Sequence, residues 1–295
     1  MAINPGALKT RALSSAVFVA LMLAAVLWSQ WSFYLLFLVI HCGCWIELQR
    51  LFGRTTPEYM SVKTELRSMP VIFGFGFMLY CIQPESNFYN QNYFLKGFAF
   101  GLMITAFVVW LFRFLQLKSY KKIVSRYTLL GFLYLSLTFG LLFHLRSSFP
   151  ADNRYFEIDF GLRIVLALMF SIWINDTMQY IVGSLIGKTP FSKISPKKTW
   201  EGTVGGILMC VVVISVTGYF TGFLPLTLLM PIAAIAGIFG TMGDLLESRL
   251  KRNAGVKDSG NILPGHGGFM DRFDSFIFSI PFVWMAVFLW LKLHH

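Results

Sequence analysis

Residues 224–293 read LPLTLLMPIAAIAGIFGTMGDLLESRLKRNAGVKDSGNILPGHGGFMDRFDSFIFSIPFVWMAVFLWLKL, with a polar segment between two long apolar runs. Each run has about the 20 apolar residues that a helix needs to cross the hydrocarbon core of a bilayer. The segment between them, Ser248 to Asp274, alternates basic residues, glycines and carboxylates. This pattern predicts two membrane-spanning helices joined by a polar connection that carries chemistry.

The whole chain has the composition of a membrane protein. Of its 295 residues, 56% are hydrophobic and only 13% are charged, and the mean hydropathy is +0.64. These values predict that the solvent of the protein is the bilayer. The 25 Lys and Arg residues exceed the 14 Asp and Glu residues, but they lie in short loops, where topology and lipid phosphates explain them. A nucleic-acid partner is therefore not expected.

Nine apolar runs predict about nine transmembrane helices in an all-α polytopic integral membrane protein. The runs lie approximately at 11–29, 31–51, 69–83, 94–116, 127–145, 162–186, 203–223, 224–246 and 272–293. The first run follows Lys9 and Arg11 as a signal peptide would, but no small-residue cleavage site separates it from the second, so a retained helix is expected. The third run is short and contains Gly74 and Gly76, which indicates a tilted, broken or re-entrant helix.

The distribution of basic residues predicts the orientation of these helices. With the N-terminus in the cytoplasm, 18 Lys and Arg residues fall in cytoplasmic loops and flanks, and five fall in the opposite ones. The positive-inside rule favours this orientation. The loops 187–202 and 247–271 then emerge on the same cytoplasmic face. Motifs concentrate after residue 160, so residues 1–160 are expected to form scaffold helices and residues 161–295 the catalytic helices with their cytoplasmic loops.

Cysteines do not indicate a disulfide framework, because all of them lie inside apolar runs. They are Cys42, Cys44, Cys81 and Cys210. His41 beside Cys42-Gly43-Cys44 offers a metal-binding interpretation. Small residues at a helix contact are the favoured alternative, since a structural zinc site requires four ligands and a polar second shell.

One carboxylate falls within an apolar run. Asp176 lies in the run 162–186, with Gln179 and Tyr180 on the same helix face. A charge at the bilayer centre costs about 2.5 to 3.5 kcal/mol, so an intramembrane aspartate indicates a functional site. The alternative is a carboxylate near the interface that caps a neighbouring helix.

Three more carboxylates border the polar segment. Asp244 precedes it, and Asp271 and Asp274 share a helix face at its end. If the segment folds back, the three converge, and their mutual repulsion of roughly 4 kcal/mol per pair at 4 Å requires a cation or protons. Oxygen-only ligands favour Mg²⁺ completed by substrate phosphates. A solvated helix N-terminus is the alternative.

The polar segment itself has the properties of a phosphate-binding loop. Its glycines let the backbone approach an anion closely with several N–H groups, and its basic residues supply charge, although topology alone explains part of them. The residues concerned are Arg249, Lys251, Arg252, Gly255, Lys257, Gly260, Gly265, His266, Gly267 and Gly268. His266 donates to a phosphate or braces the turn. The loop Ser195-Pro196-Lys197-Lys198-Thr199 combines a helix-start signal with two ammonium groups and is a second candidate anion site, or a topology signal.

Taken together, these residues resemble the phosphatidate cytidylyltransferases, also called CDP-diacylglycerol synthases. The resemblance rests on Ser248, Lys251-Arg252, Lys257-Asp258, Gly260, Leu263-Pro264, His266-Gly267-Gly268 and Asp271-Arg272-Phe273-Asp274. The loop from Ile194 to Gly202 and the preceding Asp176 also look like the family's pattern, so the resemblance covers about residues 165–280. Gln179-Tyr180 and Gly183-Ser184 depart from the Ala-Tyr and Gly-Arg usual after that aspartate, which puts the role of this helix in doubt.

The resemblance implies CTP and phosphatidate as substrates, in the cell inner membrane, with the active site facing the cytoplasm and a homodimeric assembly. It implies that Asp244, Asp271 and Asp274 hold Mg²⁺, with K⁺ as a candidate second cation. It implies phosphate-binding and catalytic roles for the remaining candidates, with Asp258 orienting Lys257 or lying near the metal. These are Asp176, Ser195, Lys197, Lys198, Thr199, Lys251, Arg252, Lys257, Asp258, His266, Gly267, Gly268 and Arg272.

Two other functions stay open on the sequence alone. The first is another CTP-dependent enzyme of lipid phosphates, such as a polyprenol kinase or an archaeol-type cytidylyltransferase. The second is an ion-coupled transporter with Asp176 in its ion path, for which the inverted repeats typical of transporters are not visible.

Overall fold

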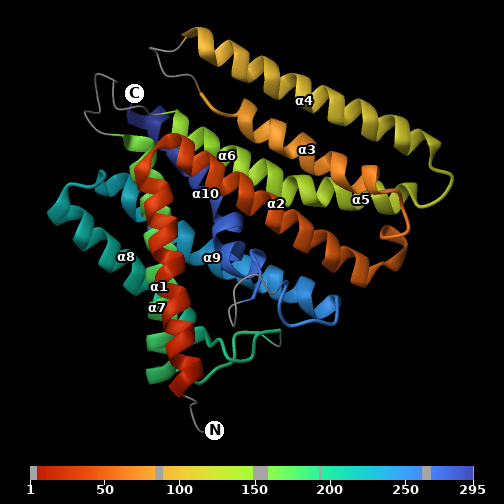
Figure 1. The fold of residues 1–295 in the computed structure, drawn as a ribbon. Coiled ribbons are helices and arrows are strands. Elements are labelled where there is room, and N and C mark those ends of the chain that lie inside the picture. Colours follow the sequence, from red (N-terminus) through yellow and green to blue (C-terminus); the bar gives the residue numbers. More distant parts are fainter. Residues whose placement is uncertain (1–4, 84–88, 149–158, 193, 261–266, 295) are drawn as a thin grey trace.

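The computed structural model describes residues 5–83, 89–148, 159–192, 194–260 and 267–294, which are almost entirely helical (Figure 1). The helices are α1 (Pro5–Trp28), α2 (Gln30–Thr55), α3 (Thr64–Tyr80), α4 (Tyr89–Gln116), α5 (Lys121–Gly131), α6 (Leu137–Ser147), α7 (Phe160–Ile186), α8 (Trp200–Thr221), α9 (Leu226–Asn253) and α10 (Met270–His294). A 3-10 turn, η1 (Pro57–Tyr59), follows α2, and a π-helical segment, η2 (Phe132–Ser136), joins α5 to α6. The predicted all-α class is confirmed, since none of the described residues forms a strand and the bridge between Pro190 and Thr199 is isolated.

Every predicted apolar run coincides with a helix, and most of the helices suit a bilayer. Seven helices in the described ranges are long and apolar enough to cross a membrane, counting α5, η2 and α6 as one. The described apolar part of α1, Ala16–Trp28, is shorter, and α3 has 17 residues. The chain thus has the helices of an integral membrane protein, while nine crossings and the orientation of the N-terminus stay predictions. Helix α3 is unbroken despite Pro70.

Helix α9 is longer than the sequence pattern predicted. The apolar run ends near residue 246, but the helix continues to Asn253, so the first part of the polar segment is helical and not a loop. Glu247 and Lys251 form an ion pair one turn apart in this extension, and Lys251 and Arg252 lie in its last turn. Both features stabilise a helix C-terminus.

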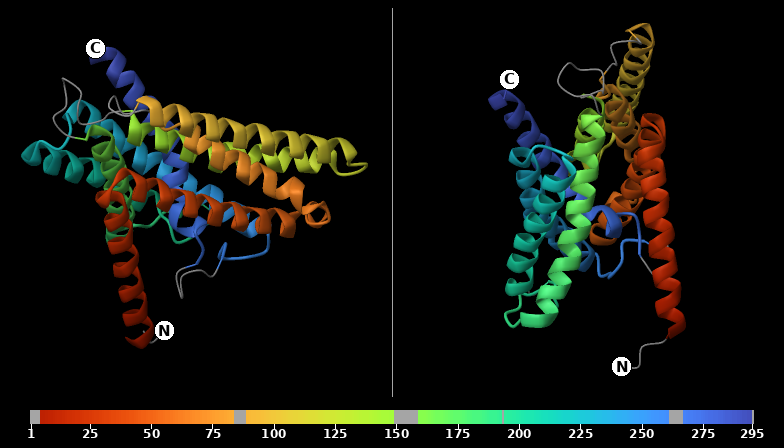
Figure 2. Two further views of the ribbon diagram at one scale, coloured as in Figure 1. Left: turned by 45° about the horizontal axis from the view of Figure 1, so that its top comes forward. Right: turned by 90° about the vertical axis from the view of Figure 1, so that its left-hand side faces the viewer.

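The two halves of the chain share one core. Helices α7, α8, α9 and α10 pack on one another, and α6 and α2 pack against α10. The ring of Phe37 on α2 stacks on that of Phe276 on α10, with centroids 5.6 Å apart and planes 16° apart. Figure 2 shows α2, α3, α4 and the α5–α6 helix running alongside one another, with α1 crossing this group at a steep angle. The motif-poor half is therefore in direct contact with the helix that carries Asp271 and Asp274.

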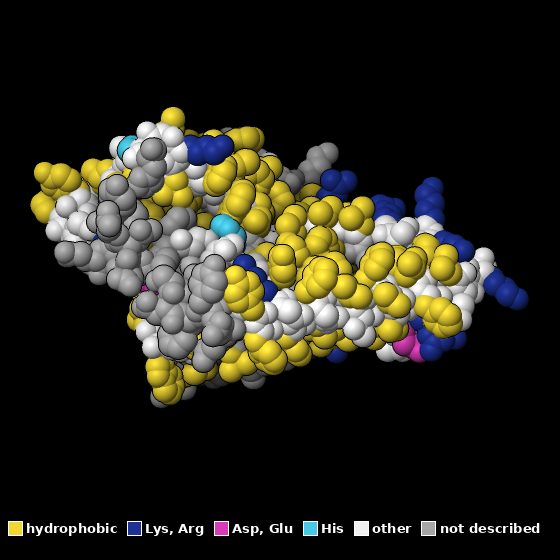
Figure 3. Space-filling view, turned by 90° about the horizontal axis from the view of Figure 1, so that it is seen from above, with side chains coloured by type: hydrophobic (Ala, Val, Ile, Leu, Met, Phe, Trp, Pro, Cys, Tyr) yellow, Lys and Arg dark blue, Asp and Glu magenta, His cyan; other side chains and the backbone are white. Residues whose placement is uncertain are grey.

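The surface agrees with a membrane environment. Figure 3 shows hydrophobic side chains spread over one face and Lys and Arg side chains gathered at one end of it. Large apolar side chains such as Phe94 on α4 and Phe220 on α8 are 79% and 81% exposed. Such exposure on many helices is unfavourable in water but favourable against lipid tails.

Candidate active site

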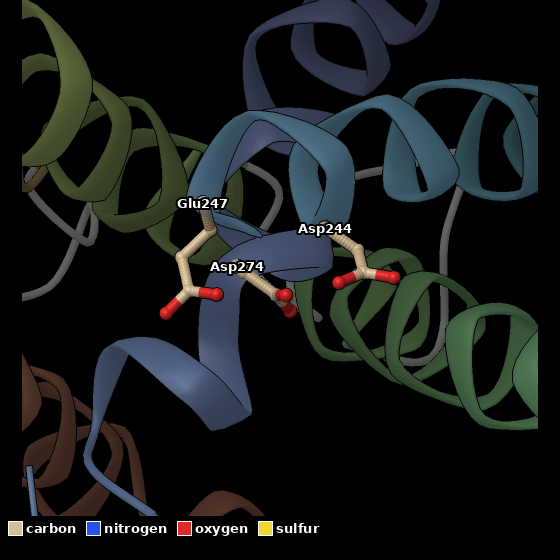
Figure 4. A group of neighbouring side chains, drawn as sticks. All are labelled: Asp244, Glu247 and Asp274. Carbon is tan, nitrogen blue, oxygen red and sulfur yellow. The ribbon is translucent and has the colours of Figure 1, made fainter. Parts of the chain in front are cut away.

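Three carboxylates meet where the end of α9 packs on the start of α10 (Figure 4). Asp244 and Glu247 lie one turn apart on α9, and Asp274 from α10 lies between them. One oxygen of each lies within 4.8 Å of the others. Charges at this separation repel by about 3.5 kcal/mol per pair at an effective dielectric constant near 20. The group therefore requires a cation or protons, and its all-oxygen donor set suits Mg²⁺.

A glycine allows the two helices to approach this closely. A Cβ atom on Gly243 would lie 2.6 Å from the backbone carbonyl oxygen of Asp274, which is too close for any side chain. The backbones of α9 and α10 therefore touch next to the acidic group. This contact brings Asp274 beside Asp244, although 30 residues separate them along the chain (274 − 244).

Two lysines contact the carboxylates. Lys198, from the loop before α8, forms an ion pair with Asp244. Lys251 forms ion pairs with Glu247 and with Asp271, whose Oδ1 lies 2.5 Å from the lysine Nζ. Glu247 is fully buried, and Lys251 is its only ionic partner in the described ranges. The ammonium groups thus offset part of the acidic charge and leave oxygen atoms for a metal ion.

Asp271 has a different environment from the one its spacing predicted. Its Oδ2 accepts hydrogen bonds from the backbone N–H of Ser259 (2.9 Å) and of Gly268 (2.7 Å), and the Ser259 hydroxyl lies 2.9 Å away. These bonds turn the carboxylate toward Lys251 and the polar connection. The structure brings all three predicted metal ligands, Asp244, Asp271 and Asp274, to one cavity, but Glu247 takes the place of Asp271 in the close group.

This cavity, of about 580 Å³, is formed by α7, α8, α9, α10 and the loop before α8. Its lining residues are Asp176, Gln179, Tyr180, Gly183, Ser184, Ser195, Lys197, Lys198, Thr199, Gly202, Thr203, Asp244, Asp271, Asp274 and Ser275. Asp176, Gln179 and Tyr180 all face it, as their helical spacing predicted. The Gln179 amide nitrogen also donates to the Thr241 hydroxyl on α9 (2.6 Å), which fixes α7 against the acidic helix.

The loop before α8 is held by hydrogen bonds on both sides of its lysines. The side chain of Thr199 accepts from Gly202 N–H (3.1 Å) and caps α8, so the helix starts at Trp200. The Glu201 carboxylate accepts from the backbone N–H of Lys188 and Thr189. Helix α8 thus starts only after the predicted stretch Ser195 to Thr199: Thr199 is its N-cap, and Lys197 and Lys198 lie in the turn that precedes it.

A second cavity, of about 240 Å³, adjoins the first and lies between α1, α7 and α10. Both cavities are lined by Asp176, Asp271, Asp274 and Ser275. The remaining lining is mostly apolar and comes from Phe18, Val19, Met22, Met169, Ile172, Trp173, Arg272, Phe273 and Phe276. Carboxylates and apolar side chains thus line this second cavity together, whereas the first cavity also carries Lys197 and Lys198.

Other candidate residues lie elsewhere. Arg252, Lys257 and Asp258 are exposed and are not among the described residues that line the 580 Å³ cavity. Asp258 instead lines a polar cavity of about 220 Å³ beside Arg50 and Arg54 of α2. His266 lies outside the described residues. Gly267 adopts φ +81°, which only glycine adopts readily, and Gly268 donates its N–H to Asp271.

Two buried glutamates were not predicted as site residues from the sequence. Glu247 lies three residues after Asp244, the same spacing that joined Asp271 to Asp274, so the helix pattern could have found it. Glu47 lies inside the apolar run 31–51 and is 1% exposed. The rule that singled out Asp176, that a charge within an apolar run indicates a functional site, applies equally to Glu47.

Comparison with known proteins agrees with this geometry. The profile described as the cytidylyltransferase family matches residues 9–290. A phosphatidate cytidylyltransferase of Staphylococcus saprophyticus is 32% identical over 249 residues, covering 84% of this chain and 87% of the relative. Proteins of the same name from Staphylococcus haemolyticus and Staphylococcus aureus are 36% and 31% identical, covering 74% and 80% of this chain and 78% and 83% of the relatives. The chain belongs to the cytidylyltransferase family.

Proposed function

We propose that the protein is a phosphatidate cytidylyltransferase, which converts CTP and phosphatidate to CDP-diacylglycerol and pyrophosphate. The observation that carries this proposal is the acidic group of Asp244, Glu247 and Asp274, beside one cavity that carries two lysines and another that combines carboxylates with apolar side chains. The family membership and the names of the relatives point to the same reaction.

The reaction joins two anions, and the lysines and carboxylates that line the 580 Å³ cavity suit this task. An oxygen of the lipid phosphate attacks the α-phosphorus of CTP, a new P–O bond forms, and the bond from the α-phosphorus to the bridging oxygen of the β-phosphate breaks to release pyrophosphate. The ionised lipid phosphate is already a nucleophile, so no proton has to be removed from it. Barriers of this kind are lowered mainly by positioning and charge stabilisation.

Asp244, Glu247 and Asp274 would hold Mg²⁺, with K⁺ as a candidate second cation. The fit rests on three carboxylates within 4.8 Å of one another and on the absence of nitrogen or sulfur donors from this group. When bound, the ion would neutralise phosphate charge and stabilise the leaving pyrophosphate. Asp271 keeps Lys251 beside this group through their 2.5 Å contact.

Phosphate binding is assigned to the loop before α8. Lys197 is exposed in the cavity, Lys198 reaches the acidic group through Asp244, and Ser195 and Thr199 bring hydroxyl groups to the same wall. Ammonium groups and hydroxyls at a helix N-terminus are suitable ligands for a triphosphate. Arg252, Lys257 and the backbone from His266 to Gly268 are proposed to extend this binding surface when substrate is present.

The lipid substrate is assigned to the 240 Å³ cavity between α1, α7 and α10. Phe18 and Met22 of α1 and Met169 and Ile172 of α7 supply apolar lining, and Arg272, Asp271 and Asp274 of α10 supply charged lining. An acyl chain would replace lipid contacts with these side chains, and the phosphate end would lie next to the acidic group and its cation. Asp176, which lines both cavities, lies where the two substrates would meet.

The proposed orientation places the N-terminus and the active site in the cytoplasm of the inner membrane, with nine crossings. The contact between Lys198 and Asp244 supports one common face for the loop before α8 and the end of α9, and the positive-inside rule is the ground for taking that face as cytoplasmic. Residues 1–160 are proposed to act as scaffold and to include the contacts of a homodimer, and residues 161–295 to carry the catalytic residues.

The proposal is tested with purified protein in detergent, CTP, Mg²⁺ and a panel of lipids. We expect CDP-diacylglycerol from phosphatidate, and little or no product from polyprenol or from an archaeol phosphate. Preference for polyprenol would indicate the kinase, and preference for the ether lipid would indicate the archaeol-type enzyme. Well-folded protein that forms no lipid product from any of these substrates would overturn the assignment.

A further inference from the structure

Glu47 on α2 reaches into the catalytic half of the chain. Its side chain is 1% exposed, and none of the ion pairs among the described residues involves it. Burial of an uncompensated carboxylate is costly, so its partners must be hydrogen-bond donors. It accepts from the Ser259 hydroxyl (2.6 Å), Phe269 N–H (2.9 Å) and Met270 N–H (2.9 Å).

These partners lie in the connection between α9 and α10, residues 254–269, and at the start of α10. Ser259 lies after α9, while Phe269 and Met270 start α10, where the Phe269 carbonyl accepts from Phe273 N–H. The first N–H groups of a helix have no partner within it, and a carboxylate is favoured at this positive end. Glu47 thus caps α10 from a helix more than 200 residues earlier in the chain, since the bond to Phe269 spans 222 positions.

The contact is linked to the active site through Ser259. The Ser259 hydroxyl lies 2.6 Å from Glu47 Oε2 and 2.9 Å from Asp271 Oδ2, and its backbone N–H donates to the same Asp271 oxygen. Glu47, Ser259 and Asp271 therefore form one chain of contacts that ends at Lys251. A change at Glu47 would reach Asp271 through Ser259, and Asp274 through the first turn of α10.

The surrounding backbone is shaped to admit this carboxylate. A Cβ atom on Gly268 would lie 2.3 Å from both Glu47 oxygens, and one on Gly43, a turn before Glu47, would lie 2.1 Å from the Phe269 ring. Gly43 is the small residue between two cysteines that the sequence analysis assigned to a helix contact. Here the contact is with Phe269, the residue that precedes α10.

We propose that Glu47 is a positioning residue of the active site, which holds both ends of the polar connection on α2 and fixes the first turn of α10. The catalytic consequence rests on the proposed function, but the positioning does not. The first half of the chain would thus set the geometry of the acidic group and not only support it in the membrane.

The test compares Glu47→Gln with Glu58→Gln, which neutralises an exposed carboxylate nearby on η1. Glutamine keeps the size of the side chain but presents an NH₂ donor to the N–H groups of α10. Hydrogen–deuterium exchange of the amides at 267–273 is expected to accelerate about tenfold or more in Glu47→Gln and to stay unchanged in Glu58→Gln. Unchanged exchange in both would overturn the proposal.

Kinetics give the second readout. In Glu47→Gln, kcat is expected to fall by about 10- to 100-fold, the usual effect of removing a residue that orients metal ligands, with a KM for CTP within about threefold of the unmodified value. Ser259→Ala should reproduce part of both effects, and the double variant should be no worse than Glu47→Gln, because one chain of contacts is lost in each.

If Glu47→Gln does not fold, Ser259→Ala decides, and normal exchange with normal kcat in that variant would contradict the proposal. If the unmodified protein makes no CDP-diacylglycerol, the proposed function fails, while accelerated exchange in Glu47→Gln would still support the positioning. A large fall in kcat with normal exchange would show that Glu47 acts by another route and would overturn the inference.

Discussion

The acidic group is expected to lower stability through repulsion and to support activity through metal binding. Asp274→Asn separates these two effects, because it should raise stability without metal and lower activity. The Asp274 carboxylate takes part in two of the three repulsive pairs with Asp244 and Glu247, all within 4.8 Å. Each pair costs about 3.5 kcal/mol at an effective dielectric constant near 20. The ion pairs of Lys198 and Lys251 offset most of this cost, so a net gain of about 1 kcal/mol without metal is expected, equivalent to about 2–4 °C in Tm.

With Mg²⁺ present, the unmodified protein is expected to be more stable than Asp274→Asn. Mg²⁺ should raise the Tm of the unmodified protein, because a ligand that binds only the folded state stabilises it by mass action, and it should raise the Tm of Asp274→Asn much less. Turnover should fall by at least about 100-fold, equivalent to about 2.7 kcal/mol of lost transition-state stabilisation. The measurements are thermal unfolding in detergent with and without Mg²⁺ and CTP incorporation into lipid. Equal stabilisation by Mg²⁺ and turnover within about threefold of the unmodified rate would refute the metal assignment.

Three further variants test the remaining parts of the site. Asp271→Asn should lower kcat by about tenfold or more, since it weakens the contact with Lys251, and a normal kcat in steady-state assays would remove that residue from the mechanism. Lys197→Ala should raise the KM for CTP or phosphatidate by about three- to tenfold, whereas Lys188→Ala, in the same loop but away from the cavity, should not; equal KM values for the two would return Lys197 to a topological role. Val19→Trp should fill the 240 Å³ cavity and raise the KM for long-chain phosphatidate more than for a short-chain analogue. Val17→Trp, at an exposed position of α1 outside the cavity lining, serves as its control, and no chain-length dependence would exclude this cavity as the acyl site.

Local patterns predicted the helices of this fold but not where every helix ends. Length and hydropathy of an apolar run depend only on consecutive residues, so each run became a helix. The end of α9 depends on an ion pair between Glu247 and Lys251 and on the start of α10 beside it. Hydropathy decreases before these contacts begin, which is why the run ended near residue 246 and the helix at Asn253.

The acidic group was predictable in composition but not in detail. Asp271 and Asp274 are three residues apart, and this spacing correctly brought them to the cavity that Asp244 also lines. Which carboxylates face one another depends on the bonds of Asp271 to Ser259 and Gly268, which lie in a non-helical segment that no periodicity describes. Glu47 could have been singled out as a charge within an apolar run, but its contact with Ser259 could not have been predicted, because 212 positions separate the two residues and no motif links them.

The central claim is that this protein transfers the cytidylyl group of CTP to a lipid phosphate, and the position of the label in the product tests it most directly. Purified protein is supplied with phosphatidate, Mg²⁺ and CTP labelled in either the α- or the γ-phosphate. The account predicts that α-label enters the chloroform-soluble lipid and that γ-label leaves as pyrophosphate, in equal amounts. Transfer of γ-label to lipid would identify a kinase instead, and no transfer of either label by folded protein would contradict the account.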